Sequence, residues 1–433
     1  MGKTMVIVVA AMMVAVAGIG AFLYFSSGED PEIKTGVLLS YDEYDCEWVT
    51  MKTEGLTVKE AFDKAQESIK TDFLGAGEDW SFLWTMSASA TEWNKTLGDW
   101  EEMNMEDFKF VAFSKKDIEP VVVKDADGDL MFNTIGSKKR IVSLSPSITD
   151  VVTAAGARSK IIGADDNSQL ELGSGVTGVG GYYSGPSFEK IVALKPDLVI
   201  ADKEVPNQVP LIARLKGAGI TVLTVAGGNT LDNICANVMT VGYVTGNIQY
   251  AKDKVDNIKS VAEELREMGE ELSPSPSVLI LMPYKYGGTF SYYVGGGLGN
   301  ASFVNDILTA AGGTNVFAST TGWQQLSLEN IYNSQPDIII VMLGMDYVSN
   351  AAEEALSDPI LAEMEAVKNG KVYSFGGDAS SKLSRPGPDL IHAMAMLYLV
   401  FSMDDDEWED NTWGEYGSDY MNILKERLPG LFQ

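Results

Sequence analysis

Two aromatic residues occupy equivalent positions in an internal repeat of this 433-residue chain. The segment Ser187–Ile200 matches Ser327–Ile340 at an offset of 140 residues, and Tyr183 and Trp323 each lie four residues before the serine of their copy. Flat, rigid aromatic rings bury a large area with little loss of side-chain entropy. The pair therefore predicts a site for a large planar ligand, with one ring on each side.

Further tyrosines follow predicted strands and would add to the wall of such a site. They are Tyr182, Tyr284, Tyr286, Tyr292 and Tyr293. For Tyr292 and Tyr293 an alternative is equally open, namely that these rings pack in the protein interior. We therefore expect Tyr182, Tyr284 and Tyr286 to bind ligand together with Tyr183 and Trp323.

The sequence offers little that is typical of an enzyme or a metal site. The single histidine, His392, lies in the apolar stretch Leu390–Phe401 and is interpreted as a core residue, so neither a histidine-rich metal site nor a Ser-His-Asp triad is expected. Cys46 and Cys235 are far apart and indicate neither a disulfide framework nor a thiolate site. We find no nucleophile elbow, Walker A loop or dinucleotide-binding glycine motif. The chain is predicted to be a non-enzyme without a cofactor of its own.

The charge balance excludes one class of partner. With 61 acidic and 32 basic residues, the formal net charge is −29, which would repel a phosphate backbone. Nucleic acid is therefore not an expected partner, and the acidity is interpreted as a solvated surface.

The repeat predicts the elements that hold these residues. A second pair, Asp150–Gly156 and Asp306–Gly312, recurs in the same order at an offset of 156 residues. Each copy reads as a helix, a Pro-Asp turn and a buried strand, which indicates two doubly wound, Rossmann-like α/β lobes. Between them, Asn247–Leu272 has apolar residues at helical spacing and is expected to join the lobes as one stiff helix.

The N-terminal segment is predicted to anchor the protein in a membrane. Met5–Phe25 is uncharged and almost wholly apolar, which is long enough to span a bilayer. Lys3 precedes it and acidic residues follow, so the bulk of the chain is expected outside the cytoplasm. Ala15-Val16-Ala17 is an alternative cleavage site. No cysteine follows in a lipobox-like setting.

A small α+β domain is expected next, with an amphipathic helix at Thr57–Ile69. After it, Pro120–Phe132 predicts a hairpin around an Asp-Gly turn rather than a calcium loop, because the glycine is misplaced for calcium binding. The predicted domains are an anchor and linker at 1–33, the small domain at 34–118, lobe 1 at 119–245, the joining helix at 246–273, and lobe 2 with an acidic C-terminal segment at 274–433.

The region from about residue 120 to 402 resembles the solute-binding proteins for vitamin B12, ferric siderophores and haem, most closely the vitamin B12 binders. The resemblance rests on both repeat pairs and on these motifs: Lys139-Arg140-Ile-Val-Ser-Leu-Ser-Pro-Ser147, Ile162-Gly-Ala-Asp-Asp166, Gly180-Gly-Tyr-Tyr-Ser-Gly185, Val367-Lys-Asn-Gly-Lys-Val-Tyr373 and Arg385-Pro-Gly-Pro388. It implies that a metal-chelate nutrient binds between two lobes and passes to an ABC importer, a permease dimer with its ATPase.

The same resemblance implies roles for single residues. Trp323 matches an aromatic that contacts the corrin ring, and Glu189 and Glu329 match glutamates that engage arginines of the permease. The alternative for these glutamates is local, because each lies in the first turn of a predicted helix, where the dipole favours a negative charge.

Basic residues near the expected site limit the charge of the ligand. Lys285 and Arg385 would pair with acidic groups of a siderophore, and tyrosinates could ligate ferric ion. Basic residues are nevertheless sparse there, which favours a ligand of low net charge and slightly favours a corrinoid. Cobalt or iron would then belong to the ligand. Two rival functions remain open: an α/β enzyme that holds a metal cofactor at the cleft, and a surface sensor that uses the same lobes.

Overall fold

The fold is described by a computed structural model. It describes these residues: 36–40, 46–68, 82–86, 94–96, 101–108, 110–114, 123–128, 131, 139–181, 185–228, 230–286, 289–343, 351–403, 412–413 and 420–432. The chain forms two compact units, one of Met1–Val122 with Phe132–Ile135 and one of Val123–Met131 with Gly136–Gln433.

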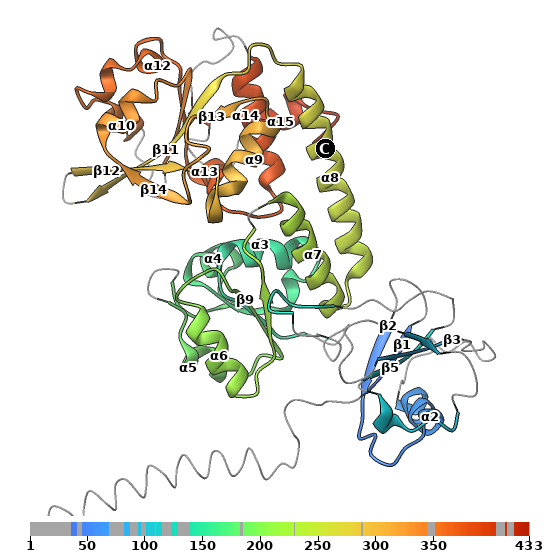
Figure 1. The fold of residues 1–433 in the computed structure, drawn as a ribbon. Coiled ribbons are helices and arrows are strands. Elements are labelled where there is room, and N and C mark those ends of the chain that lie inside the picture. Colours follow the sequence, from blue (N-terminus) through green and yellow to red (C-terminus); the bar gives the residue numbers. More distant parts are fainter. Residues whose placement is uncertain are drawn as a thin grey trace, which may run out of the picture. The chain divides into compact units, whose positions relative to one another are not determined.

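In its described residues, the first unit is a five-stranded sheet with the helix α2 (Val58–Ser68) on its face (Figure 1). The strands are β1 (Gly36–Ser40), β2 (Cys46–Thr50), β3 (Phe82–Met86), β4 (Asn94–Thr96) and β5 (Phe110–Ser114), in the order β2-β1-β5-β3-β4. Helix α2 confirms the predicted helix. It begins with a capping box, since Glu60 N–H donates to Thr57 Oγ1 and Thr57 N–H donates to the Glu60 carboxylate. Phe62 and Ala65 of α2 pack against Leu83 and Phe113 of the sheet.

The second unit begins with a wholly parallel sheet. Its order is β10-β9-β6-β7-β8, and its strands are β6 (Ile141–Ser143), β7 (Ile161–Ala164), β8 (Thr177–Gly178), β9 (Leu198–Asp202) and β10 (Val222–Val225). The helices are α3 (Pro146–Ala154), α4 (Asp166–Leu172), α5 (Phe188–Ala193), α6 (Val209–Gly217) and α7 (Leu231–Thr245). Strands β6, β9 and β10 are fully buried, as expected for parallel strands covered on both faces. We call this sheet and its helices lobe 1.

A second sheet, which with its helices we call lobe 2, is mixed rather than parallel. Its order is β14-β12-β11-β15-β16-β17, with β13 beside β11, and its strands are β11 (Ser277–Tyr286), β12 (Thr289–Gly295), β13 (Thr314–Asn315), β14 (Trp323–Leu326), β15 (Ile338–Met342), β16 (Val372–Phe375) and β17 (Thr412–Trp413). Strands β12 and β14 pair antiparallel to their neighbours, which corrects the expectation of a parallel sheet. Too few residues separate β11 from β12 for a crossover, so the two must form a hairpin.

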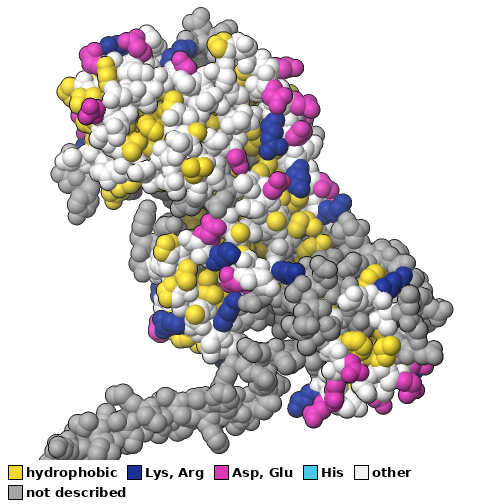
Figure 2. All heavy atoms as spheres, viewed as in Figure 1, with side chains coloured by type: hydrophobic (Ala, Val, Ile, Leu, Met, Phe, Trp, Pro, Cys, Tyr) yellow, Lys and Arg dark blue, Asp and Glu magenta, His cyan; other side chains and the backbone are white. Residues whose placement is uncertain are grey.

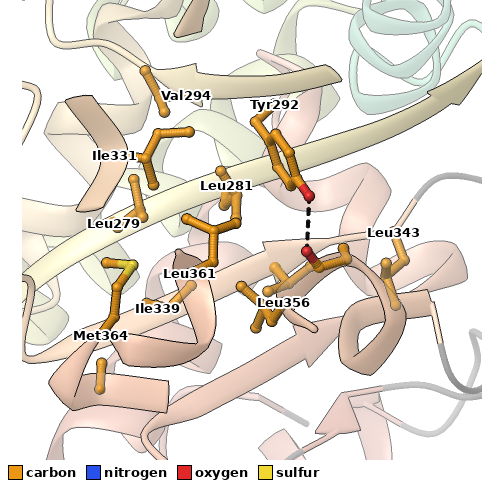
Figure 3. Close-up of a cluster of buried hydrophobic side chains, with 13 residues drawn as sticks. Leu279, Leu281, Tyr292, Val294, Ile331, Ile339, Leu343, Leu356, Leu361 and Met364 are labelled. Carbon is orange, nitrogen blue, oxygen red and sulfur yellow. Dashed lines mark hydrogen bonds between the residues drawn. The ribbon is translucent and has the colours of Figure 1, made fainter. Parts of the chain in front are cut away.

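Helices cover both faces of the second sheet (Figure 1). They are α9 (Ser302–Ala310), α10 (Leu328–Asn333), α11 (Ala351–Leu356), α12 (Glu365–Lys368), α13 (Gly377–Ser384), α14 (Leu390–Ser402) and α15 (Tyr420–Arg427). On the face of α10, α11 and α12, Leu281 and Ile339 of the sheet pack against Ile331, Leu356 and Leu361 (Figure 3).

The long helix predicted between the lobes is α8 (Ile248–Glu270), whose 23 residues give a length of about 35 Å at a rise of about 1.5 Å per residue. Val255, Ile258, Val261 and Leu265 form its buried face, which confirms the predicted spacing. It contacts α7 of lobe 1 and α9 and α14 of lobe 2. Acidic and basic side chains alternate along its outward face (Figure 2), and include the pair Lys252–Asp256. One stiff element thus packs on both lobes.

The two copies of the repeat adopt the same local structure. Ser187 Oγ accepts from Lys190 N–H at the start of α5, and Ser327 Oγ accepts from Asn330 N–H at the start of α10. The residue before each proline has a positive φ, 48° at Lys195 and 35° at Gln335. In each copy the following aspartate binds the start of the neighbouring strand.

These two aspartates fix strand order. Asp197 accepts from Lys139 N–H and Arg140 N–H at the entry to β6. Asp337 Oδ2 accepts from Ser277 N–H at 2.8 Å and Ser277 Oγ–H at 2.6 Å at the entry to β11. The repeated aspartate therefore joins the last strand of each copy to the first strand of its lobe.

The predicted hairpin after the first unit is confirmed at its turn. Gly128 N–H donates to Asp125 O, Met131 N–H donates to Val123 O, and Gly128 has a φ of 85°, which favours glycine. The buried Asp125 carboxylate accepts from Thr224 Oγ1–H at 2.8 Å and lies 3.7 Å from Lys216 Nζ. This aspartate thus attaches the turn to lobe 1.

The predicted membrane anchor, Met5–Phe25, lies outside the described residues. Within the part of the chain that the structure describes, no helix combines the length and apolar character required to cross a bilayer.

Candidate functional site

The expected aromatic wall is described in part. Tyr182 and Tyr183 lie outside the described residues, and Tyr286 ends β11 with its side chain likewise outside them. Tyr284 lies in β11 and is 60% exposed. Trp323 is the first residue of β14, the edge strand of the second sheet, and is half-buried.

Glycine makes room for the Trp323 ring. Trp323 pairs with Gly295 on β12, and a Cβ atom at Gly295 would lie 3.4 Å from the indole and 3.0 Å from Val304 Cγ1. The indole therefore rests on bare backbone, on the α9 side of the sheet. Leu326, three residues further along β14, faces the opposite side and packs on the core of Figure 3.

The segment that leads to Trp323 is held against a run of glycines. Gly296 N–H donates to Gly322 O, and Leu298 N–H donates to Thr320 O. A Cβ at Gly296 would lie 2.2 Å from Thr320 O, and one at Gly297 would lie 2.3 Å from Ala318 O. No side chain fits there, so Gly296 and Gly297 allow the close approach that positions Trp323. The three consecutive glycines were visible in the sequence, but their role was not predicted.

The adjacent tyrosines of β12 separate by strand alternation. Tyr292 is buried in the lobe 2 core, where its hydroxyl donates to Ala355 O at 2.8 Å (Figure 3). Burial raises the pKa of Tyr292. Tyr293, on the other face, is half-buried. Packing in the interior is thus the correct interpretation for Tyr292, and both residues lie within β12 instead of after a strand as expected.

Arg385 binds across the two lobes. It directly follows α13 in lobe 2, and both its Nη1 and Nη2 donate to Glu171 Oε1 on α4 of lobe 1, each at 3.1 Å. The arginine side chain is 19% exposed and that of the glutamate 42%. Glu171 was not among the predicted site residues, and nothing in its sequence surroundings distinguishes it.

The segment after Arg385 lies directly on lobe 1. A Cβ at Gly228 would lie 2.8 Å from Pro386, and one at Gly387 would lie 3.5 Å from Asp150 Oδ2. Burial raises the pKa of Asp150 to about 6, although Lys382 and Arg385 oppose this effect. Asp150, Glu171 and Arg385 therefore lie together where the two lobes meet, and we call these three residues the junction cluster.

Behind this cluster, Lys382 and Asp389 form an ion pair at 2.7 Å. Burial opposes the charge on Lys382, but Asp389 outweighs it and raises the lysine pKa. His392 Nδ1 lies 3.2 Å from Tyr420 Oη, and burial lowers the pKa of His392 to about 4. The histidine packs beside Tyr420 and Phe432, as its interpretation as a core residue predicted.

The two repeat glutamates are exposed at the first turns of α5 and α10. Glu189 accepts from its own backbone N–H and from Ser187 Oγ–H, which lower its pKa, and its carboxylate lies 3.6 Å from Arg214 Nη2. Arg214 also lies over the Phe188 ring, 4.3 Å from its centroid. Next to the start of α10, a cavity of about 570 Å³ is lined by Ser327, Leu328, the first residues of β12, the last residues of β14, Glu354 and residues 357–359.

Metal ligation has no support among the described residues. Within them, no group of three histidine, cysteine, aspartate or glutamate side chains is close enough to hold an ion. Cys235 is buried, free and has a pKa raised by burial.

Comparisons with known proteins agree on one family. A model of the periplasmic binding protein family matches residues 141–379. An ABC transporter substrate-binding lipoprotein of Bacillus subtilis is 29% identical over 301 residues, covering 66% of this chain and 87% of the relative. A cobalamin-binding protein of Halobacterium salinarum is 28% identical over 294 residues, covering 65% of this chain and 74% of the relative. A periplasmic haem-binding protein of Pseudomonas aeruginosa superimposes with a TM-score of 0.53 at 25% identity, covering 61% and 92% of the two chains.

Proposed function

This chain belongs to the periplasmic binding protein family, and we propose that it is the extracytoplasmic solute-binding component of an ABC importer for a metal-chelate nutrient. The family match supports this most, because it spans the parallel sheet of lobe 1, helix α8 and most of lobe 2. The family and the named relatives are binding proteins, which favours capture and release of an unchanged ligand over catalysis.

We propose a corrinoid as the ligand, bound between the lobes. Relatives named for binding cobalamin or vitamin B12 match this chain over most of their own length. The half-buried Trp323 ring at the sheet edge suits a flat macrocycle. Tyr182, Tyr183, Tyr284 and Tyr286 would complete the wall. Charge supports the same choice, because Lys285 is paired with Glu354 and Arg385 with Glu171.

Docking on the permease is proposed for Glu189 and Glu329. Both are exposed at equivalent helix starts, so one charged contact per lobe would orient the protein on a permease dimer with its ATPase. Arg214 neutralises Glu189 in part and would have to exchange it for a permease arginine. The cavity beside Ser327 and Leu328 would give a permease side chain space next to Glu329.

Attachment to the membrane is proposed through the apolar segment Met5–Phe25. The name of the Bacillus subtilis relative, a lipoprotein of an ABC transporter, supports a location at the outer face of the membrane. The predicted domain boundaries at residues 33, 118, 245 and 273 stay proposals.

Titration calorimetry tests the ligand assignment. The full chain, purified in detergent, is titrated with cyanocobalamin, haemin and ferric citrate, and the released ligand is checked by mass spectrometry. The expected result is tight, saturable binding of cyanocobalamin with the ligand recovered intact. Binding of haemin or ferric citrate alone would overturn the corrinoid assignment, and chemical conversion of the ligand would overturn the binding-protein assignment.

A further inference from the structure

Arg385 is the cation placed to bind an acidic group of a ligand between the lobes. Its guanidinium is 19% exposed and lies where lobe 2 meets lobe 1. Guanidinium groups bind carboxylates and related anions through paired, charge-assisted hydrogen bonds. In this protein, however, Glu171 Oε1 accepts from both terminal nitrogens. A carboxylate of the chain itself thus occupies the place that an anionic ligand would take.

Among the described residues that act on Asp150, both cations are already paired. Lys382, the other cation that acts on Asp150 from the same lobe, is bound to Asp389. Asp150 itself lies next to Gly387 and adds a third carboxyl group to those of Glu171 and Asp389. An anionic group that displaced Glu171 from Arg385 would leave that glutamate unpaired beside Asp150. Displacement of Glu171 from Arg385 would therefore offset part of the gain from the new ion pair, although the 42% exposure of the glutamate keeps this cost modest.

We propose that Glu171 is a specificity-determining residue, which neutralises Arg385 and thereby selects ligands without a free anionic group at the junction cluster. The proposal rests on the proposed function, because it needs the ligand to bind between the lobes. It goes beyond that function by naming the charge of the accepted ligand and the residue that sets it.

A structural alternative is a simple latch, in which the Glu171–Arg385 pair only holds the lobes together. A latch predicts that any weakening of the pair changes the affinity for neutral and anionic ligands by the same factor. A charge filter predicts instead that the ratio of the two affinities changes. The ratio therefore separates the two roles even if the variant also loses some stability.

The test compares ligands that differ by one charge. Full-length protein and the Glu171→Gln variant are titrated with cyanocobalamin and with its monocarboxylic acids, in which one side-chain amide is hydrolysed. The glutamine keeps the shape and can still accept a hydrogen bond, but it no longer neutralises Arg385. For at least one monocarboxylic acid, the affinity relative to cyanocobalamin should rise by about tenfold, and the gain should shrink with added salt.

Two further variants make the result specific. Glu363→Gln removes one negative charge from an exposed ion pair of lobe 2, that with Lys368, which belongs to no predicted ligand contact, and should leave the affinity ratio unchanged. Combining Glu171→Gln with Arg385→Ala should abolish the gain for the acid. Equal factors for both ligands, or an equal change of ratio in Glu363→Gln, would reject the charge filter.

Failure of the proposed function gives a different pattern. If wild-type protein does not bind cyanocobalamin, the corrinoid assignment fails, and the charge filter is then tested with haemin, whose two propionates are anionic. Haemin binding that is tight in the wild type and not strengthened by Glu171→Gln would reject the filter by itself. Haemin binding that is weak in the wild type and strengthened about tenfold in the variant would support it.

Discussion

Removal of the Trp323 ring should weaken corrinoid binding by about one order of magnitude. A tryptophan side chain buries about 150 to 250 Å² when fully enclosed, and because about a third of this one or less is exposed in the protein, roughly 50 to 80 Å² remains for a ligand. At about 25 cal/mol per Å², that area contributes about 1.3 to 2 kcal/mol. Each 1.4 kcal/mol is about a factor of ten in affinity, so Trp323→Ala should raise Kd by about tenfold to about thirtyfold.

Titration calorimetry with cyanocobalamin measures this change directly. A second variant, Gly295→Val, keeps the ring but displaces it, because even a Cβ there lies 3.0 Å from Val304 Cγ1 and 3.4 Å from the indole. The control is Gln324→Ala, an exposed neighbour on the other face of β14. Thermal melts establish that each variant is folded. An affinity for Trp323→Ala within twofold of the wild type, in folded protein, would show that Trp323 does not contact the ligand.

Three other changes test docking, the repeat and the junction cluster. Glu189→Arg with Glu329→Arg should leave cyanocobalamin affinity intact and abolish uptake in cells that lack the native copy; normal uptake would leave only the helix-dipole role. Asp337→Ala removes two hydrogen bonds at the entry to β11, and because the carboxylate is exposed the loss should be only about 1 kcal/mol in urea unfolding. The pKa of Asp150 is raised from 3.8 to about 6 in the folded state. Between these two pH values the folded protein binds more protons at this group than the unfolded chain does, so the free energy of unfolding falls as pH rises from about 4 to 6. The stability of Asp150→Asn relative to wild type should therefore rise between pH 4 and 6, by at most about 3 kcal/mol, and a pH-independent difference would contradict the shift.

Local patterns predicted much of the fold because they reflect local physics. In both copies of the repeat, the Ser-x-Glu pair lies at the start of a helix, and the Pro-Asp pair lies just before the strand that follows this helix. The structure shows that Ser187 and Ser327 cap their helices, and it adds the partners of Asp197 and Asp337. The spacing of Val255, Ile258, Val261 and Leu265 defines one buried helix face, so α8 was predictable almost to its ends.

Strand direction was harder to predict in lobe 2. A short apolar strand does not reveal whether its partner runs parallel or antiparallel, and the repeat misled because it contains β15 but not β12. The short connection between Tyr286 and Thr289 was the available sign, since it permits only a hairpin. Recognition of that hairpin would also have assigned Tyr292 and Tyr293 to opposite faces.

The Glu171–Arg385 pair could not be predicted, because 214 residues separate its members and no local pattern links them. From its sequence position, Arg385 is expected to be a cation available to a ligand. In the structure its charge is already paired with that of Glu171 on the opposite lobe. The scarcity of basic residues near the expected site and the pairing of Arg385 with Glu171 both disfavour an anionic ligand. A ligand site formed by aromatic rings, with its nearest cation neutralised, gains affinity from buried area and loses it with every anionic group added. Selection for an uncharged macrocycle is therefore what the proposed role of Trp323 and the pairing of Arg385 with Glu171 together predict.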